Sequence, residues 1–312
     1  MIKTNDYPLS RKEFLKKSSK GLLALTLLGK IPLSLLPAPT AYAQAAPQYR
    51  TLGRTQIKVS PVGFGASRTM EPALVKSGLD RGMNFFDTGR RYFNGQNEVM
   101  LGKVVRGIRK EVVIQSKARI SLRGEKDLLT STEGSKKIRT MLDTSLKESL
   151  KALQTDYIDI FLIHGASTVA IIEHEAVMSF FSMAKEKGQI RACGFSSHDN
   201  QVALLNTANN NKFYDVLMIP YNHKGSYTHS LGGHHREWDQ PALELELQKA
   251  ERNKIGVIAM KTCSAGPYSP DGKSTPSYKA ALKWVLNHSY VSSMAVAMGN
   301  VKEINENVQA ML

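Results

Sequence analysis

Two patterns alternate along the chain from Leu52 onward, and this alternation limits the possible folds more than any other feature. Short runs of apolar and β-branched residues are each followed by a longer segment whose apolar residues recur every three or four positions. The eight strand-like runs are 61–65, 84–88, 112–117, 157–164, 190–196, 216–221, 255–262 and 293–298. Near-continuous apolar strands separated by helices are typical of a parallel sheet that helices cover.

The segments between these strands have helical spacing. The clearest is 136–153, where Ile138, Leu142 and Leu146 begin an apolar series that continues to Leu153. The others are 71–80, 97–106, 171–187, 241–253, 277–287 and 302–310. Eight strand-and-helix units in roughly 260 residues match a (β/α)8 TIM barrel, and a doubly wound open sheet is the alternative. Segment 51–59 is a candidate hairpin that closes the bottom of the barrel.

Residues 1–46 do not fit the alternation. A basic stretch at 10–17 leads into a short apolar run at 21–29, and small residues follow at 41–43. This order predicts a signal peptide cleaved after Ala43, so we expect 1–46 to be signal peptide and linker and 47–312 to be the barrel. The apolar run is shorter than the roughly 20 residues that span a bilayer, so we expect no stable membrane anchor after cleavage.

The basic stretch resembles the twin-arginine export signal S-R-R-x-F-L-K, with Arg11-Lys12 in place of the arginine pair. The resemblance implies a periplasmic or otherwise exported protein that folds in the cytoplasm before export. An ordinary secretory signal and an uncleaved amphipathic tail are the alternatives.

The net charge of +15 is spread along the chain without a stripe of arginines interleaved with aromatic residues. We therefore interpret it as a solvated basic surface and expect no nucleic-acid partner. The two cysteines, Cys193 and Cys263, form neither a disulfide framework nor a CxxC metal motif. We expect both to be packed free thiols.

Polar residues at strand ends are the candidates for chemistry, because barrel enzymes carry their active sites on the rim where the strands end. Asp87, Lys117 and His164 end the second, third and fourth predicted strands. Tyr92 follows Asp87 by five residues in the next loop. Each residue alone has an ordinary structural explanation, but their placement on successive strands predicts a shared site.

This group suits the reduction of a carbonyl. A carbonyl that accepts hydride becomes an alkoxide and needs a proton donor. A free tyrosine has a pKa of about 10, and a nearby ammonium such as that of Lys117 is expected to lower it. Asp87 would hold Lys117 in place, and His164 would polarise the carbonyl oxygen. The expected substrate is a small-molecule carbonyl compound.

The chain resembles the aldo-keto reductases over essentially everything after Arg50. The resemblance rests on R-T-L-G-R-T at 50–55, V-S-P-V-G-F-G at 59–65, G-M-N-F-F-D-T at 82–88, the stretch from Ser149 to His164, and G-Q-I-R-A-C-G-F-S at 188–196. The aspartate, tyrosine, lysine and histidine that the family uses match Asp87, Tyr92, Lys117 and His164. The resemblance implies a (β/α)8 barrel and a cofactor, NADPH or NADH, bound without a Rossmann domain.

The resemblance also implies a set of cofactor-binding positions. They are Gly65, Ala66, Ser196, Ser197, Met218, Met260, Lys261, Glu303 and Asn307. Met218 stands where the family often has glutamine, and Met260 stands where it often has a stacking tyrosine. A carboxylate repels a 2′-phosphate but accepts a hydrogen bond from a free 2′-hydroxyl. Glu303 therefore leads to the hypothesis that NADH binds at least as well as NADPH.

Two loops are candidates for the substrate side, 119–134 and the histidine-rich 223–240. We expect the second to be a lid, and the spacing of its histidines supports no metal motif. Two other functions stay open: a binding or regulatory protein with weak turnover, and an aldolase that uses Lys117 for a Schiff base. Reduced nicotinamide is not at hand outside the cytoplasm, so an exported reductase would need a trapped cofactor or a redox partner, unless export fails.

Overall fold

A computed structural model of the chain describes residues 48–121, 129–229 and 232–312. The predicted signal peptide and its Arg11-Lys12 pair lie outside the described residues. The described residues from 48 onward belong to a compact unit, Ala46–Leu312. In these described ranges, no helix combines the length and the hydrophobicity needed to cross a bilayer.

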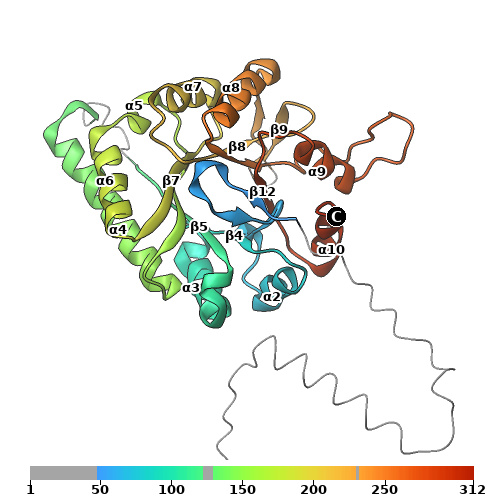
Figure 1. Ribbon diagram of the computed structural model, residues 1–312, viewed down its shortest axis with the longest axis horizontal. Helices are drawn as coiled ribbons and strands as arrows, with labels where there is room; N and C mark the ends of the chain where they lie inside the picture. The colour runs from blue at the N-terminus through green and yellow to red at the C-terminus, as the bar shows by residue number, and fades with distance from the viewer. Residues whose placement is uncertain (1–47, 122–128, 230–231) are drawn as a thin grey trace, which may run out of the picture. The chain divides into compact units, whose positions relative to one another are not determined.

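Eight parallel strands form a closed barrel in this unit, which confirms the predicted fold (Figure 1). Around the ring they are β3 (Val62–Gly65), β4 (Phe85–Asp87), β5 (Val113–Ala118), β6 (Ile158–Ile163), β7 (Ile190–Ser196), β8 (Val216–Pro220), β11 (Gly256–Met260) and β12 (Ser293–Ala297). The ring closes where β12 pairs with β3, with Ala295 beside Gly63. This closure excludes the doubly wound open sheet.

A helix follows each barrel strand, and the helices surround the strands in Figure 1. They are α2 (Pro72–Asp80), α3 (Gln96–Val105), α4 (Thr132–Leu153), α6 (Glu175–Glu186), α7 (Gln201–Asn211), α8 (Gln240–Arg252), α9 (Tyr278–Leu286) and α10 (Val301–Gln309). Shorter helical segments are η3 (Gly53–Thr55), η4 (Ala66–Arg68), η5 (Tyr92–Gly95), η6 (Arg106–Glu111) and α5 (Val169–Ile172).

Two helices differ from the sequence prediction. The predicted helix 171–187 is divided into α5 and α6, because His174 has extended backbone angles and its ring nitrogen accepts the Ala176 N–H as an N-cap. Helix α7 was not predicted. Its asparagine-rich sequence has low helix propensity, but Leu204, Leu205 and Ala208 pack into the core and stabilise it.

The bottom of the barrel is closed by the predicted hairpin, formed by β1 (Arg50–Thr51) and β2 (Lys58–Val59). Leu52 and Ile57 are buried and pack with the side chains that fill the barrel interior. The Arg54 N–H donates to the Lys254 carbonyl at 2.7 Å, just before β11, which places the hairpin at the amino ends of the strands. The carboxyl ends of the strands are not covered by this hairpin.

Cys193 is buried, Cys263 is half-buried, and both are free thiols.

Candidate active site

Lys117 and Asp87 form a buried ion pair at the carboxyl ends of β5 and β4. Only 1% of Lys117 and 3% of Asp87 is exposed. The Lys117 Nζ donates to Asp87 Oδ1 at 2.5 Å, to the Thr88 carbonyl at 2.9 Å and to the Tyr92 hydroxyl at 3.2 Å. The three donors of one ammonium thus join two strand ends and the tyrosine that follows the first of them.

Tyr92 begins a tight loop segment between β4 and α3. Phe93 and Asn94 adopt left-handed backbone angles, and Gly95 has a φ of +83°. A Cβ at position 95 would lie 2.7 Å from the flexible end of Arg90, and it is the positive φ that favours glycine at this position. Strained backbone of this kind persists where surrounding contacts hold it.

Those contacts come from Glu98 at the start of α3. Its carboxylate is fully buried and accepts from Arg90 Nη1 at 2.6 Å. It also accepts from Ser116 Oγ at 2.5 Å and Ser149 Oγ at 2.8 Å. Since Ser116 precedes Lys117 in β5, this buried network connects the loop that carries Tyr92 to the strand that carries Lys117.

His164 lies beside Tyr92 at the end of β6. The two rings are 6.0 Å apart between centroids and nearly perpendicular, at 84°. Within the part of the chain that the structure describes, the buried His164 Nδ1 has no hydrogen-bond partner. Burial lowers the pKa of His164 to about 3, and the charge of Lys117 acts in the same direction. The imidazole is therefore neutral at physiological pH.

The direction of the Tyr92 pKa differs from the prediction. Burial raises the pKa of Tyr92 above its ordinary value, and the nearby Lys117 ammonium opposes this rise without reversing it. Burial also acts to lower the pKa of Lys117, but Asp87 and Tyr92 outweigh it and hold that pKa above normal. Lys117 is thus charged, and Tyr92 keeps its proton at neutral pH, as a proton donor must.

One member of this cluster was missed by the sequence analysis. Gln115 is fully buried in β5, and its Nε2 lies 2.5 Å from Asp87 Oδ1. The available signal was its position two residues before Lys117, because residues two apart in a strand face the same side.

The predicted cofactor positions at the strand ends lie on the same rim. Gly65 ends β3, and a Cβ there would lie 2.8 Å from the Val296 backbone, so the close approach of β12 requires glycine. Ala66 follows it and is buried. Ser196 Oγ accepts from the Gly165 N–H at 3.1 Å, and Ser197 is buried beside it.

Met218 lies in the middle of β8, Met260 ends β11, and Lys261 follows it. The two methionines are buried in the barrel interior. The Lys261 Nζ lies 5.2 Å from the Tyr227 ring centroid, and burial lowers the pKa of Lys261. Among the described residues, no carboxylate contributes to the shift in the Lys261 pKa.

Glu303 has a structural role that the sequence analysis did not consider. Asn300 caps α10 by accepting the Glu303 N–H at 2.9 Å, and the Glu303 carboxylate accepts from the Gly299 N–H at 2.7 Å. This arrangement is a variant of the capping box in which the carboxylate accepts from the residue before the N-cap. Asn307 lies one turn further along α10 and is buried.

The comparisons with known proteins identify the family. The family model described as the aldo/keto reductase family matches residues 65–270, more than half of the chain. The chain belongs to the aldo/keto reductase family. It is 26% identical over 302 residues to the L-galactose dehydrogenase of Arabidopsis thaliana, covering 84% of this chain and 88% of the relative. Other curated relatives match over about half of their own length.

Solved structures share the fold of this aldo/keto reductase. The holo form of an aldo-keto reductase from Bacillus halodurans has a TM-score of 0.66 at 22% identity, over 85% of this chain and 90% of that one. An aldo/keto reductase from Klebsiella pneumoniae, solved in complex with NADP and acetate, has a TM-score of 0.60 at 20% identity. The match covers 85% of this chain and 90% of that chain.

The histidine-rich loop of this aldo/keto reductase forms a hairpin, β9 (Ser226–Thr228) and β10 (His235–Glu237), with residues 230–231 outside the described ranges. Tyr227 hydrogen-bonds to His198 Nδ1 at 3.0 Å, and Arg236 pairs with Asp199 at 2.8 Å. The hairpin therefore contacts the loop that follows Ser197. Its histidines form no metal-binding group with other described residues.

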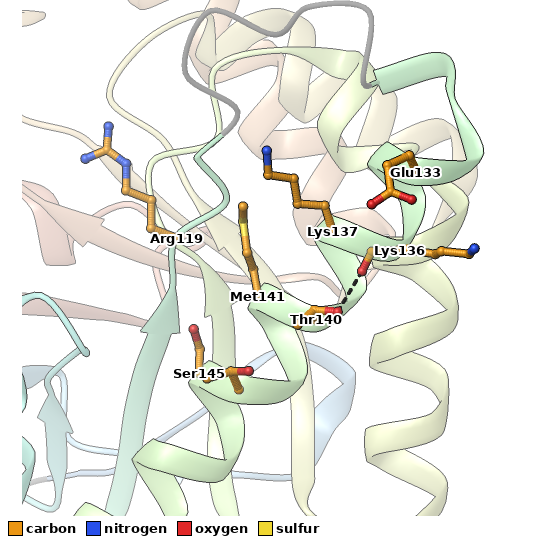
Figure 2. Close-up of a pocket in the computed structure, with 8 residues that line it drawn as sticks. Arg119, Glu133, Lys136, Lys137, Thr140, Met141 and Ser145 are labelled. Carbon is orange, nitrogen blue, oxygen red and sulfur yellow. Dashed lines mark hydrogen bonds between the residues drawn. The ribbon is translucent and has the colours of Figure 1, made fainter.

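A separate hollow of about 690 Å³ lies between the end of β5 and α4 (Figure 2). Its lining includes three basic residues and one acidic residue, which are Arg119, Lys136, Lys137 and Glu133. In Figure 2 the Lys136 side chain points away from Arg119. This basic hollow contains no member of the Asp87, Tyr92, Lys117 and His164 group.

Proposed function

We propose that the protein is an NAD(P)H-dependent reductase that converts aldehydes or ketones to alcohols, with Tyr92 as the proton donor. The observation that carries the proposal is the hydrogen-bonded series from Asp87 through Lys117 to Tyr92, with the unpartnered Nδ1 of His164 beside it. An orphaned polar atom in a buried site is typical of a group that binds a ligand.

The rim suits a nicotinamide dinucleotide, which would supply the hydride for the carbonyl carbon. Lys261 offers a half-buried cation without a carboxylate partner in the described part of the chain, which suits a phosphate. Ser196 and Ser197 offer hydroxyls near His164, and Gly65 and Ala66 offer close backbone approach. Support comes also from the Klebsiella pneumoniae relative, which was solved with NADP.

Each residue of the group has a distinct task in the proposal. The neutral His164 donates a hydrogen bond to the carbonyl oxygen and polarises it. As hydride reaches the carbonyl carbon, the Tyr92 hydroxyl gives its proton to the oxygen, so that an alcohol and a tyrosinate result. The Lys117 ammonium, 3.2 Å away, stabilises that tyrosinate until it takes a proton from solvent. Asp87 keeps Lys117 in place.

Replacing Tyr92 with phenylalanine tests the proposal. We expect kcat for reduction of small aldehydes and aldoses to fall by about 10²- to 10⁴-fold, because a positioned acid contributes that much. Aldoses are included because a relative is named L-galactose dehydrogenase. The matched control is Tyr157→Phe, since Tyr157 packs against Arg109 at the amino end of β6, at the opposite end of the strand from His164. Equal rates for Tyr92→Phe and the wild type would overturn the proposal.

Two further measurements separate the other candidate functions, a binding protein and an aldolase. A protein that binds nicotinamide but gives no turnover with either variant is a binding protein on this barrel. Trapping of a carbonyl compound on Lys117 by borohydride, lost in Lys117→Met, identifies an aldolase.

We also propose that NADH binds at least as well as NADPH. The Glu303 carboxylate lies at the amino end of α10, where it already accepts the Gly299 N–H and would repel a 2′-phosphate. Dissociation constants measured by fluorescence should favour NADH or be equal. Glu303→Gln should improve NADPH binding several-fold, and a clear NADPH preference in the wild type contradicts the proposal.

Export by the twin-arginine route is proposed from residues 1–46 alone. Cell fractionation should place the mature protein in the periplasm and the Arg11→Gln, Lys12→Gln variant in the cytoplasm. Export of that double variant at the wild-type level would count against this route.

A further inference from the structure

Gln115 is a polar residue in the interior of the barrel, and its register partner in β4 is Asp87. It is fully buried in the middle of β5, and its register partner in β6 is Ile160. Its Nε2 lies 2.5 Å from Asp87 Oδ1 and 3.2 Å from the Met218 sulfur. Burial of an amide costs free energy unless hydrogen bonds compensate, so a side chain of this type needs a reason to be there.

The orientation of the amide follows from its partner. A carboxylate oxygen only accepts, so the Gln115 nitrogen must face Asp87. The Gln115 Oε1 then has no partner among the described residues. The amide thus satisfies Asp87 while leaving one of its own polar atoms unpaired, which shows that the contact with Asp87 determines the position of the side chain.

Asp87 Oδ1 therefore accepts two donors, Lys117 Nζ and Gln115 Nε2, each at 2.5 Å. Only one of the two donors carries a charge. Two donors on one oxygen share its electron density, so each holds it less strongly than it would alone. The Lys117 ammonium also holds the Tyr92 hydroxyl, and any change at Asp87 reaches Tyr92 through it.

We propose that Gln115 is a positioning residue for proton transfer, which shares the Asp87 carboxylate with Lys117 and so leaves the ammonium free to stabilise the Tyr92 oxygen. This inference rests on the proposed function, in which Tyr92 is the proton donor. Gln115 acts through Asp87 and Lys117.

The charges that face Tyr92 decide the sign of the effect. Lys117 faces it from β5 and Asp87 from β4, and the neutral His164 lies beside it after β6. Arg91 and the His198 imidazole, whose pKa burial lowers to about 4, act on His164. Without the Gln115 amide the negative charge of Asp87 is less screened, and a nearby negative charge disfavours the phenolate. The pKa of Tyr92 should therefore rise.

The experiment is the pH profile of alcohol oxidation with the full chain and an oxidised nicotinamide, since this direction needs the Tyr92 phenolate. In Gln115→Leu the inflection should move upward by about one pH unit, because a hydrogen bond to a charged group is worth about that much. Below the inflection, kcat should fall about tenfold while the dissociation constant of the cofactor is unchanged.

Two further variants make the result specific. Gln115→Met keeps the length of the side chain and should shift the profile like Gln115→Leu, and it replaces that variant if leucine prevents folding. Ile160→Val changes packing beside Gln115 without removing a polar group and should keep the wild-type inflection.

The outcomes separate this inference from the proposed function. If Tyr92→Phe retains wild-type activity, the proposed function fails. If Tyr92→Phe is inactive but Gln115→Leu and Gln115→Met show the wild-type inflection, the role of Gln115 is overturned while the function stands. An equal shift in Ile160→Val also overturns it, because packing alone would then explain the effect.

Discussion

At the scale of single residues, the site is made of buried ionisable groups that differ in their charge state. His164 and Lys117 are both buried, but Lys117 has a carboxylate partner and keeps its charge, whereas His164 has none and stays neutral. Tyr92 keeps its proton because burial raises its pKa more than the Lys117 ammonium lowers it. The contrast follows from pairing, because a buried charge is stable only beside an opposite one.

The Lys117 and Asp87 pair should be costly to break from one side. Lys117→Met leaves the Asp87 carboxylate buried without its cation and should lower the free energy of unfolding by about 3–5 kcal/mol. Asp87→Asn combined with Lys117→Met removes both charges and should cost less than Lys117→Met alone. Urea denaturation measures both, and equal or larger loss in the double variant contradicts the argument.

His164 should make the protein sensitive to acid. Its pKa is about 3 in the folded state, below the ordinary 6.5, so the unfolded chain binds the proton first as the pH falls. Stability is therefore complete above pH 6.5 and decreases toward pH 3. Between pH 7 and pH 4 the wild type should lose roughly 3 kcal/mol of unfolding free energy through His164, and His164→Asn should not show this loss. The check is urea denaturation at several pH values. If the free energy of unfolding depended on pH in the same way in the wild type and in His164→Asn, the buried imidazole would not be neutral.

At the scale of elements, the loop between β4 and α3 is held by the start of the helix that follows it. Glu98 accepts from Arg90 in the loop, from Ser116 in β5 and from Ser149 in α4. Four elements therefore meet at one carboxylate, next to the left-handed backbone of Phe93 and Asn94.

Glu98→Gln should displace Tyr92 without removing any group that touches substrate. We expect kcat to fall about tenfold, because small misplacements of a catalytic group are costly, while cofactor binding is retained. Glu148→Gln is the matched control, since Glu148 pairs with the same Arg90 but its side chain is 54% exposed. A kcat equal to that of the control would mean that the network does not position Tyr92.

At the scale of the whole molecule, the two ends of the barrel are divided between stability and chemistry. The β1–β2 hairpin closes the amino ends with Leu52 and Ile57, and the candidate site occupies the carboxyl ends. This division is general for the fold, because the loops after the strands vary without disturbing the core.

Leu52→Ala should therefore destabilise the fold and leave the chemistry intact. The side chain is fully buried, so the loss should be about 2–5 kcal/mol, with kcat unchanged at temperatures where the protein is folded. Leu245→Ala, at a position that is 59% exposed, should change stability by less than about 0.5 kcal/mol. Thermal unfolding measures both, and a loss of kcat in folded Leu52→Ala would argue against this separation.

The sequence by itself determined the barrel and the strand ends that carry Asp87, Lys117 and His164. Apolar runs and helical spacing are local patterns, and the closed parallel topology then places strand ends on one rim. The N-cap of α10 was also readable, because Asn300 and Glu303 are three apart in the chain.

Only the tertiary structure decided which side chains from different strands are in contact and how burial shifts their pKa values. Helix α7 has weak local preference and forms through its packing, and the contact of Gln115 with Asp87 depends on the register of β4 and β5. The direction in which the Tyr92 pKa shifts also depended on the tertiary structure. The sequence showed the ammonium that lowers it, but burial, which raises it more, is a property of the folded molecule.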